Sequence, residues 1–160
     1  MGGKGSHACI WGLLFDVEKD LAPAAIGMVA IYIVGFIFYG ILFSAAWQRV
    51  MAIDKGVRRA DAIKSRYSML TCSIGHLVMG FLQSAAIIAV LKLLAMTKSA
   101  AAGDSLCMYM QAAGVVFVAQ MTALHHSMWE QRPFGLIFLT ALGDKLSLFA
   151  AAAAIFYYTH

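Results

Sequence analysis

A run from Leu21 to Trp47 contains no charged side chain, and it limits the possible folds more than any other feature of the chain. A helix of roughly 20 mostly apolar residues can cross the hydrocarbon core of a bilayer, where it satisfies its own backbone hydrogen bonds. Three more apolar runs follow, at about 67–96, 106–129 and 134–158. The sequence therefore predicts an all-α fold, an integral membrane four-helix bundle over residues 21–160, preceded by an N-terminal extramembrane segment, residues 1–20.

The composition supports a membrane environment. Hydrophobic residues make up 62% of the 160-residue chain and charged residues 12%, whereas a soluble domain averages about 25% charged residues. So few charged side chains cannot cover a surface that faces water, and membrane lipids are the expected surroundings. Cys9, Cys72 and Cys107 are far apart and form no CxxC pair, which argues against a disulfide framework or a zinc site.

Basic residues are concentrated in the first and third loops between the spans. These loops carry Arg49, Lys55, Arg58, Arg59, Lys64, Arg66 and Arg132, whereas the other side has Lys4, Lys19, Lys92 and Lys98. Loops rich in Lys and Arg stay on the cytoplasmic side. We therefore expect a multi-pass protein of an organelle inner membrane, such as the mitochondrial one, or of the plasma membrane. Loops one and three would lie in the matrix or cytoplasm, and no nucleic-acid partner is expected.

Polar side chains inside the spans form a candidate intramembrane cluster. Its members are His76, Gln83, Gln120, His125, His126 and Asp144. At about 1.5 Å of rise per residue, Asp144 lies about 15 Å into its span, close to the bilayer midplane. It could be a carboxylate that titrates or binds a ligand, or a buried acid that holds helices together. We expect His76 or His125 as its partner, and the adjacent Lys145 on a different side of the helix.

Metal and cofactor sites are not expected. His125, His126 and Glu130 could bind a metal together with His76, but Trp129 and Arg132 place them at the membrane interface, where such residues are common. A haem between His76 and His125 would need two helices at matching depth, and they differ by about 6 Å. The sequence also contains no Ser-His-Asp order, Gly-rich phosphate loop or paired catalytic carboxylates. We therefore do not expect an enzyme.

Two small-xxx-small pairs predict close helix packing. They are Gly40 with Ser44 on the first span and Gly80 with Ser84 on the second. Small residues at this spacing let helix backbones approach closely in a membrane. We therefore expect spans one and two to meet through Gly40 and Gly80.

Two segments resemble a known family. "GFIFYGILFSAAW" is similar to the first-helix signature of the domain-of-unknown-function family seventeen sixty-one, and "HHSMWEQRPFGLIFLTALGDKLSL" to its closing signature. The matching positions are Gly35, Tyr39, Gly40, Leu42, Phe43, Trp47, Trp129, Glu130, Arg132, Pro133, Leu139, Gly143 and Leu146. Asp144 and Lys145 stand where a small polar or aromatic residue is common in the family. The resemblance implies a small four-helix integral membrane protein without an established activity.

The function expected from these features is non-enzymatic. We expect a structural or accessory subunit of a larger membrane protein complex, with membrane lipids and other membrane subunits, or copies of itself, as partners. The alternative is a small oligomeric transporter or proton-coupled carrier that uses the intramembrane Asp and His residues. A membrane enzyme or redox protein is a third possibility, without a motif to support it.

Overall fold

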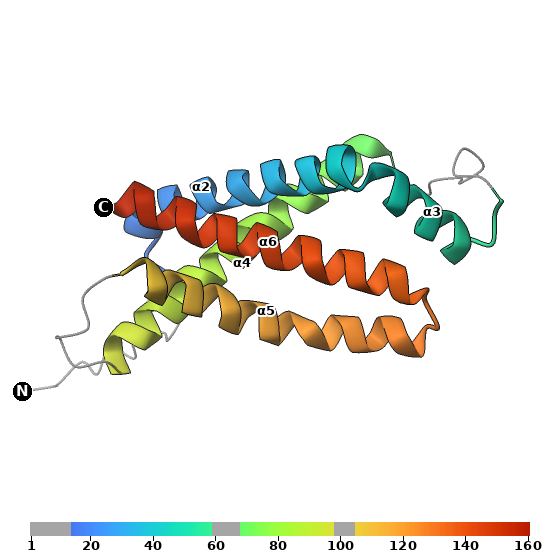
Figure 1. Cartoon of the computed structure of the whole chain (residues 1–160). Helices are drawn as coiled ribbons and strands as arrows, with labels where there is room; N and C mark the ends of the chain where they lie inside the picture. Colours follow the sequence, from blue (N-terminus) through green and yellow to red (C-terminus); the bar gives the residue numbers. More distant parts are fainter. Residues whose placement is uncertain (1–13, 59–67, 98–104) are drawn as a thin grey trace, which may run out of the picture.

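The computed structural model describes residues 14–58, 68–97 and 105–160 (Figure 1). Its elements are α2 (Val17–Phe36), the π-helix η1 (Ile37–Leu42), α3 (Ser44–Asp54), α4 (Met69–Thr97), α5 (Leu106–Trp129) and α6 (Phe134–Thr159). Within these residues there is no strand, and four helical segments are long and apolar enough to cross a membrane: 17–42, 70–96, 106–129 and 134–159. The predicted all-α bundle of four membrane-length helices is therefore confirmed. Arg59, Lys64 and Arg66, and residues 1–13 of the expected extramembrane segment, lie outside the described residues.

Capping explains why the first helix begins at Val17, four residues before the predicted span. The side chain of Asp16 accepts a hydrogen bond from the Glu18 N–H at 3.1 Å, as an N-cap residue does. Glu18 and Asp20 add negative charge to the first turn, where the helix dipole favours it. Pro23 lies inside this helix, in its second turn, where it has no N–H to donate to the carbonyl of the preceding turn.

The first span is not one α-helix up to Trp47, as the apolar run suggested. After Phe36 the chain forms the π-helix η1, and the backbone at Phe43 leaves the helical region with φ −115° and ψ 17°. The wider turn of η1 buries Phe38 and places the Tyr39 side chain against α6. α3 then continues as a separate helix, so Trp47 belongs to α3 and not to the span.

The four membrane-length helices pack as a ring in which α2 and α5 each lie against both α4 and α6. Figure 1 shows α2, α5 and α6 running side by side while α4 crosses them obliquely. The apolar core is centred on Ile31, Ile87, Leu148 and Ile155, each 1% exposed or less, together with alanines of α5 and α6. These residues lie in the half of the bundle that contains the start of α2 and the end of α6.

The contact between α2 and α4 uses only part of the expected small-residue pairs. Gly80 lies against Ile31 and Met28 of α2, with room for a Cβ at 3.5 Å from the nearest side-chain atom. Ser84 is fully buried, and a Cβ on Gly27 of α2 would lie 2.6 Å from its Oγ.

Gly40 and Ser44 do not take part in this contact. The nearest atoms to a Cβ on Gly40 belong to Phe36 of its own chain segment, and Ser44 accepts a long hydrogen bond from Gln48 within α3. The reason is the π-turn, which changes the direction of the chain just where these two residues lie. The close approach of the first two spans is therefore made by Gly27, which lies between three and four turns before Gly40.

The outer surface of the bundle is apolar. Large side chains such as Ile33, Val118, Phe138 and Tyr157 are 50–71% exposed in the isolated chain. In water such a surface would be unfavourable, but in a bilayer it meets lipid chains of equal polarity. The exposed surface therefore agrees with the membrane environment that the composition indicates.

Candidate functional site

A polar cavity of about 260 Å³ lies between α4, α5 and α6, in the half of the bundle nearest the α5–α6 turn. It is lined by Met79, Gln83, Phe117, Gln120, Ala123, Ser127, Thr140 and Asp144. The apolar core described above is confined to the other half, and the oblique course of α4 accompanies a weak contact between α4 and α6. The cavity therefore occupies the part of the bundle interior that packing leaves open.

The cavity contains hydrogen-bonding groups that the described residues leave without partners. The Gln120 Oε1 atom is buried and accepts no hydrogen bond, and no hydrogen bond or ion pair reaches the Asp144 carboxylate within the described part of the chain. Thr140 and Ser127, in contrast, donate to carbonyls of their own helices, to Leu136 at 2.9 Å and to Ala123 at 3.4 Å. The unused capacity of this cavity therefore includes two acceptors, the Asp144 carboxylate and Gln120 Oε1, beside the side-chain amide of Gln83.

Of the six expected cluster residues, the structure brings together Gln83, Gln120 and Asp144. The expected pairing of Asp144 with His76 or His125 is not made. The His76 ring faces α2, where its centroid lies 5.9 Å from that of Tyr32 and its Nε2 borders Gly35. His76 lies seven residues, about two helical turns, before Gln83 on the same side of α4. Its position along the obliquely crossing α4 therefore places it against α2 and not at the cavity (Figure 1).

The two histidines of α5 lie near its exposed end. His125 accepts a hydrogen bond from the Trp129 indole N–H at 2.9 Å, and its ring centroid lies 6.0 Å from that of His126. Both histidines are exposed. In the described ranges no three His, Cys, Asp or Glu residues are arranged to hold a metal. These histidines therefore belong to the interface end of α5 and not to the cavity.

Asp144 and Lys145 face different surroundings, as their 100° separation on a helix predicts. Asp144 is half-buried in the cavity, whereas Lys145 is exposed with its ammonium 5.9 Å from the centroid of the Phe149 ring. The acid therefore points into the bundle, and the base points to its surface beside an aromatic face.

Tyr39 of η1 packs against α6 next to two residues that line the cavity, Thr140 and Asp144. Its hydroxyl lies 3.4 Å from the carbonyls of Leu139 and Thr140, and a Cβ on Gly143 would overlap that hydroxyl. Tyr39 also lies close enough to Asp144 for the two side chains to interact electrostatically. The missing side chain of Gly143 therefore lets η1 and α6 approach, which positions Tyr39 next to the acid.

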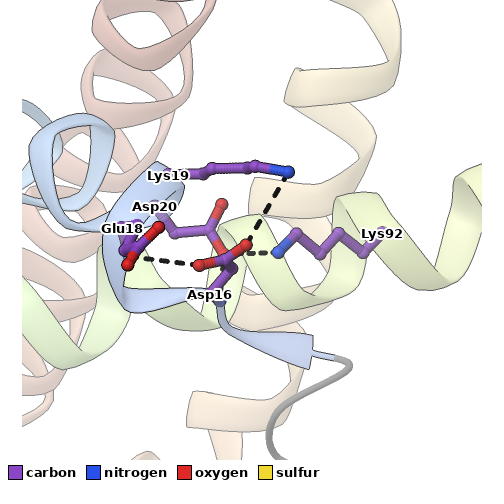
Figure 2. Close-up of polar contacts among 5 residues, drawn as sticks. All are labelled: Asp16, Glu18, Lys19, Asp20 and Lys92. Carbon is purple, nitrogen blue, oxygen red and sulfur yellow. Dashed lines mark hydrogen bonds and ion pairs between the residues drawn. The ribbon is translucent and has the colours of Figure 1, made fainter.

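A second polar site joins α2 and α4 at the end of the bundle that lies opposite the cavity (Figure 2). Lys92 of α4 forms an ion pair with Asp20 of α2, and Asp20 also accepts a hydrogen bond from the Asp16 N–H at 2.6 Å. The side chains of Lys92 and Asp20 are 30% and 10% exposed. Lys19 approaches Asp16 at 3.9 Å.

Sequence reasoning missed this ion pair because the partners lie 72 residues apart. A signal was present, since Asp20 opens one span and Lys92 closes the next, which places both at the same membrane surface. Two opposite charges at equal depth on consecutive spans are candidates for pairing.

One comparison with known proteins gave a match. Residues 22–157 match a family described as a protein of unknown function, DUF1761. This is the family whose signatures the two segments resemble, and the match includes α2 from residue 22 onward, η1 and all residues that line the cavity. No curated protein and no solved structure matches the chain.

Proposed function

We propose that this chain, which belongs to the DUF1761 family of unknown function, is a non-enzymatic subunit of a larger membrane assembly. In this proposal the cavity between α4, α5 and α6 receives a polar side chain from a membrane helix of the partner. The observation that carries it is the unpartnered pair of acceptors, Asp144 and Gln120 Oε1, inside a membrane-length bundle.

The energetics favour a donor from outside the chain. An unpaired carboxylate near the midplane costs at least about 2.5–3.5 kcal/mol, and a buried amide oxygen without a donor costs about 1–3 kcal/mol. A Lys, Arg or other donor side chain on a neighbouring helix would remove both costs together. Polar side chains serve to hold helices together in membranes in this way.

The second candidate function is a small carrier, which a different observation supports. The polar cavity lies in one half of the bundle. The other half is closed by the apolar core around Ile87 and Leu148 and by the Asp20–Lys92 ion pair. A carrier needs a midplane site that one side of the membrane reaches at a time. In this alternative, Asp144 would bind a proton or a small cation.

Photo-crosslinking from the cavity tests the proposal. A photoreactive residue at Ala123, which lines the cavity, is compared with one at Val118, which is 67% exposed on the outer face of α5. We expect Ala123 to crosslink one defined membrane protein, and Asp144→Leu to reduce this crosslink about tenfold, because the partner's donor loses its acceptor. Lys145→Leu, one position along the helix, is the matched control and should leave the crosslink unchanged.

The outcomes separate the two candidates. Equal crosslinking from Ala123 in the wild type and in Asp144→Leu contradicts the subunit proposal. Asp144→Asn keeps the shape of the side chain and removes its charge. If this variant retains the crosslinked assembly but loses pH-dependent solute uptake in proteoliposomes, the carrier is supported instead.

A further inference from the structure

A second cavity, of about 250 Å³, lies at the end of the bundle that contains the Asp20–Lys92 ion pair. All four membrane-length helices contribute to it. Its polar lining consists of Lys19, Asp20, Lys92, Tyr109 and Thr159, and the rest of its wall is apolar. It is separate from the Asp144 cavity and shares no lining residue with it.

The cavity lies at one surface of the membrane. Lys19 and Asp20 are in the first turn of α2, Tyr109 is in the first turn of α5, and Thr159 is the last residue of α6. Lys92 is near the end of α4. Because these helix ends mark the boundary of the hydrocarbon core, a molecule in the cavity would have its polar part at head-group depth.

The remaining donor capacity of the lining belongs to its two ammonium groups. Thr159 Oγ1 lies 3.0 Å from the Ile155 carbonyl, to which it donates, and 3.2 Å from the Tyr109 hydroxyl. The hydroxyl proton of Tyr109 is therefore used by Thr159. Lys92 has three N–H donors and gives one to Asp20. Among the described residues, the ion-pair partner of Lys19 is Asp16, at 3.9 Å.

Both positively and negatively charged side chains lie at this site. Figure 2 shows the carboxylates of Asp16 and Glu18 beside the Asp20–Lys92 pair, with Lys19 reaching toward Asp16. An anion in the cavity would gain from the two lysines and be repelled by the neighbouring acids. A head group that carries a phosphate and an ammonium together matches both signs.

We infer that this cavity binds one zwitterionic phospholipid from the surrounding bilayer. Its phosphate oxygens accept hydrogen bonds from Lys19 and Lys92, and its ammonium group lies toward Asp16 and Glu18. One acyl chain packs against the apolar wall formed by Ile88, Leu91 and Met108. The bound lipid joins α2, α4 and α5 at the end of the bundle where the ion pair already connects two of them. This inference does not depend on the proposed function.

Lipid retention tests the inference. The full chain is reconstituted in nanodiscs of mixed phosphatidylethanolamine and phosphatidylglycerol, released into mild detergent, and analysed by native mass spectrometry. We expect one phosphatidylethanolamine per chain. Ala95→Phe places a ring in the cavity and should lower this occupancy about tenfold, as overpacking does. Met96→Phe, on the same helix but outside the lining and 59% exposed, should leave it unchanged.

Three results would overturn the inference: no retained lipid on the wild type, retention of phosphatidylglycerol in preference, or equal retention by the Ala95 and Met96 variants. A second measurement covers the case in which the Ala95 variant does not fold. The wild type is labelled with phosphatidylethanolamine that carries a photoreactive group in its acyl chain. Labelling should concentrate at residues 88–95 and at Met108, and labelling spread evenly over the outer face would contradict the site.

Discussion

At the scale of single residues, glycines decide how closely the helices approach. Gly143 has Tyr39 directly against its Cα, so even one added methyl group would overlap the phenol hydroxyl. Tyr39 is held from two other sides, by Phe38 at 4.9 Å and Trp47 at 4.7 Å between ring centroids. It cannot move away without disturbing η1 and α3. The position of the ring beside Asp144 therefore depends on the absence of one side chain.

This contact gives a prediction with a matched control. Gly143→Ala should lower stability by about 1–3 kcal/mol, because the added methyl group forces Tyr39 out of place. Gly114→Ala, in the middle of α5, has no atom within 4 Å of the new Cβ. It should be neutral or stabilising by up to about 1 kcal/mol, because alanine favours helix. Melting temperatures of the two variants in the same detergent check this, and equal values would show that Tyr39 does not occupy the space beside Gly143.

At the scale of elements, the interface between α2 and α4 positions the first half of the bundle. Gly80 contacts Ile31 and Met28, and the Ser84 hydroxyl donates to the Gly80 carbonyl at 2.9 Å. The Ser84 hydroxyl is thereby satisfied within α4 while its side chain fills the space left by Gly27. This arrangement brings the two helices into close contact and aligns Lys92 with Asp20 further along the same pair.

Substitution of two glycines on α4 tests this interface. Gly80→Leu should destabilise the bundle by about 1–3 kcal/mol, because the additional carbons meet Ile31 at an interface that has room only for a Cβ. Gly75→Leu, on the same helix, has open space around its Cβ and should have little effect. The fraction folded after heating in detergent, read by gel filtration, is the measurement. Similar loss for both variants would refute the contact of α2 with α4 at this position.

At the scale of the whole molecule, the start of α2 and the end of α6 lie at the same end of the bundle. Both line the cavity of about 250 Å³ that we infer to bind a phospholipid. The turn between α5 and α6 lies at the other end, with Trp129 and Arg132. An even number of membrane-length helices produces this arrangement, since each crossing reverses the direction of the chain. We expect the end with the basic loops to face the cytoplasm or matrix.

Labelling from each side of the membrane tests this topology. In a chain whose own cysteines are replaced, single cysteines at Lys19 and at His160 should react with an impermeant reagent from one side. A cysteine at Gly56, in the basic turn after α3, should react from the opposite side, and we expect that side to be the cytoplasm or matrix. Opposite labelling of Lys19 and His160 would exclude four crossings, and labelling of Gly56 from outside would reverse the orientation.

The sequence by itself determined the four membrane-length helices and the position of Asp144 along the last of them, because apolar length and position along a helix are local properties. It also separated Asp144 from Lys145, since helical periodicity alone sets their directions. Only the tertiary structure decided which polar groups meet. The ion pair of Asp20 with Lys92, and the separation of His76 from Asp144, depend on how each helix is rotated and crossed. Those angles result from packing between residues far apart in the chain, such as Gly27 with Ser84 and Tyr39 with Gly143, and from the π-turn that ends the first span early.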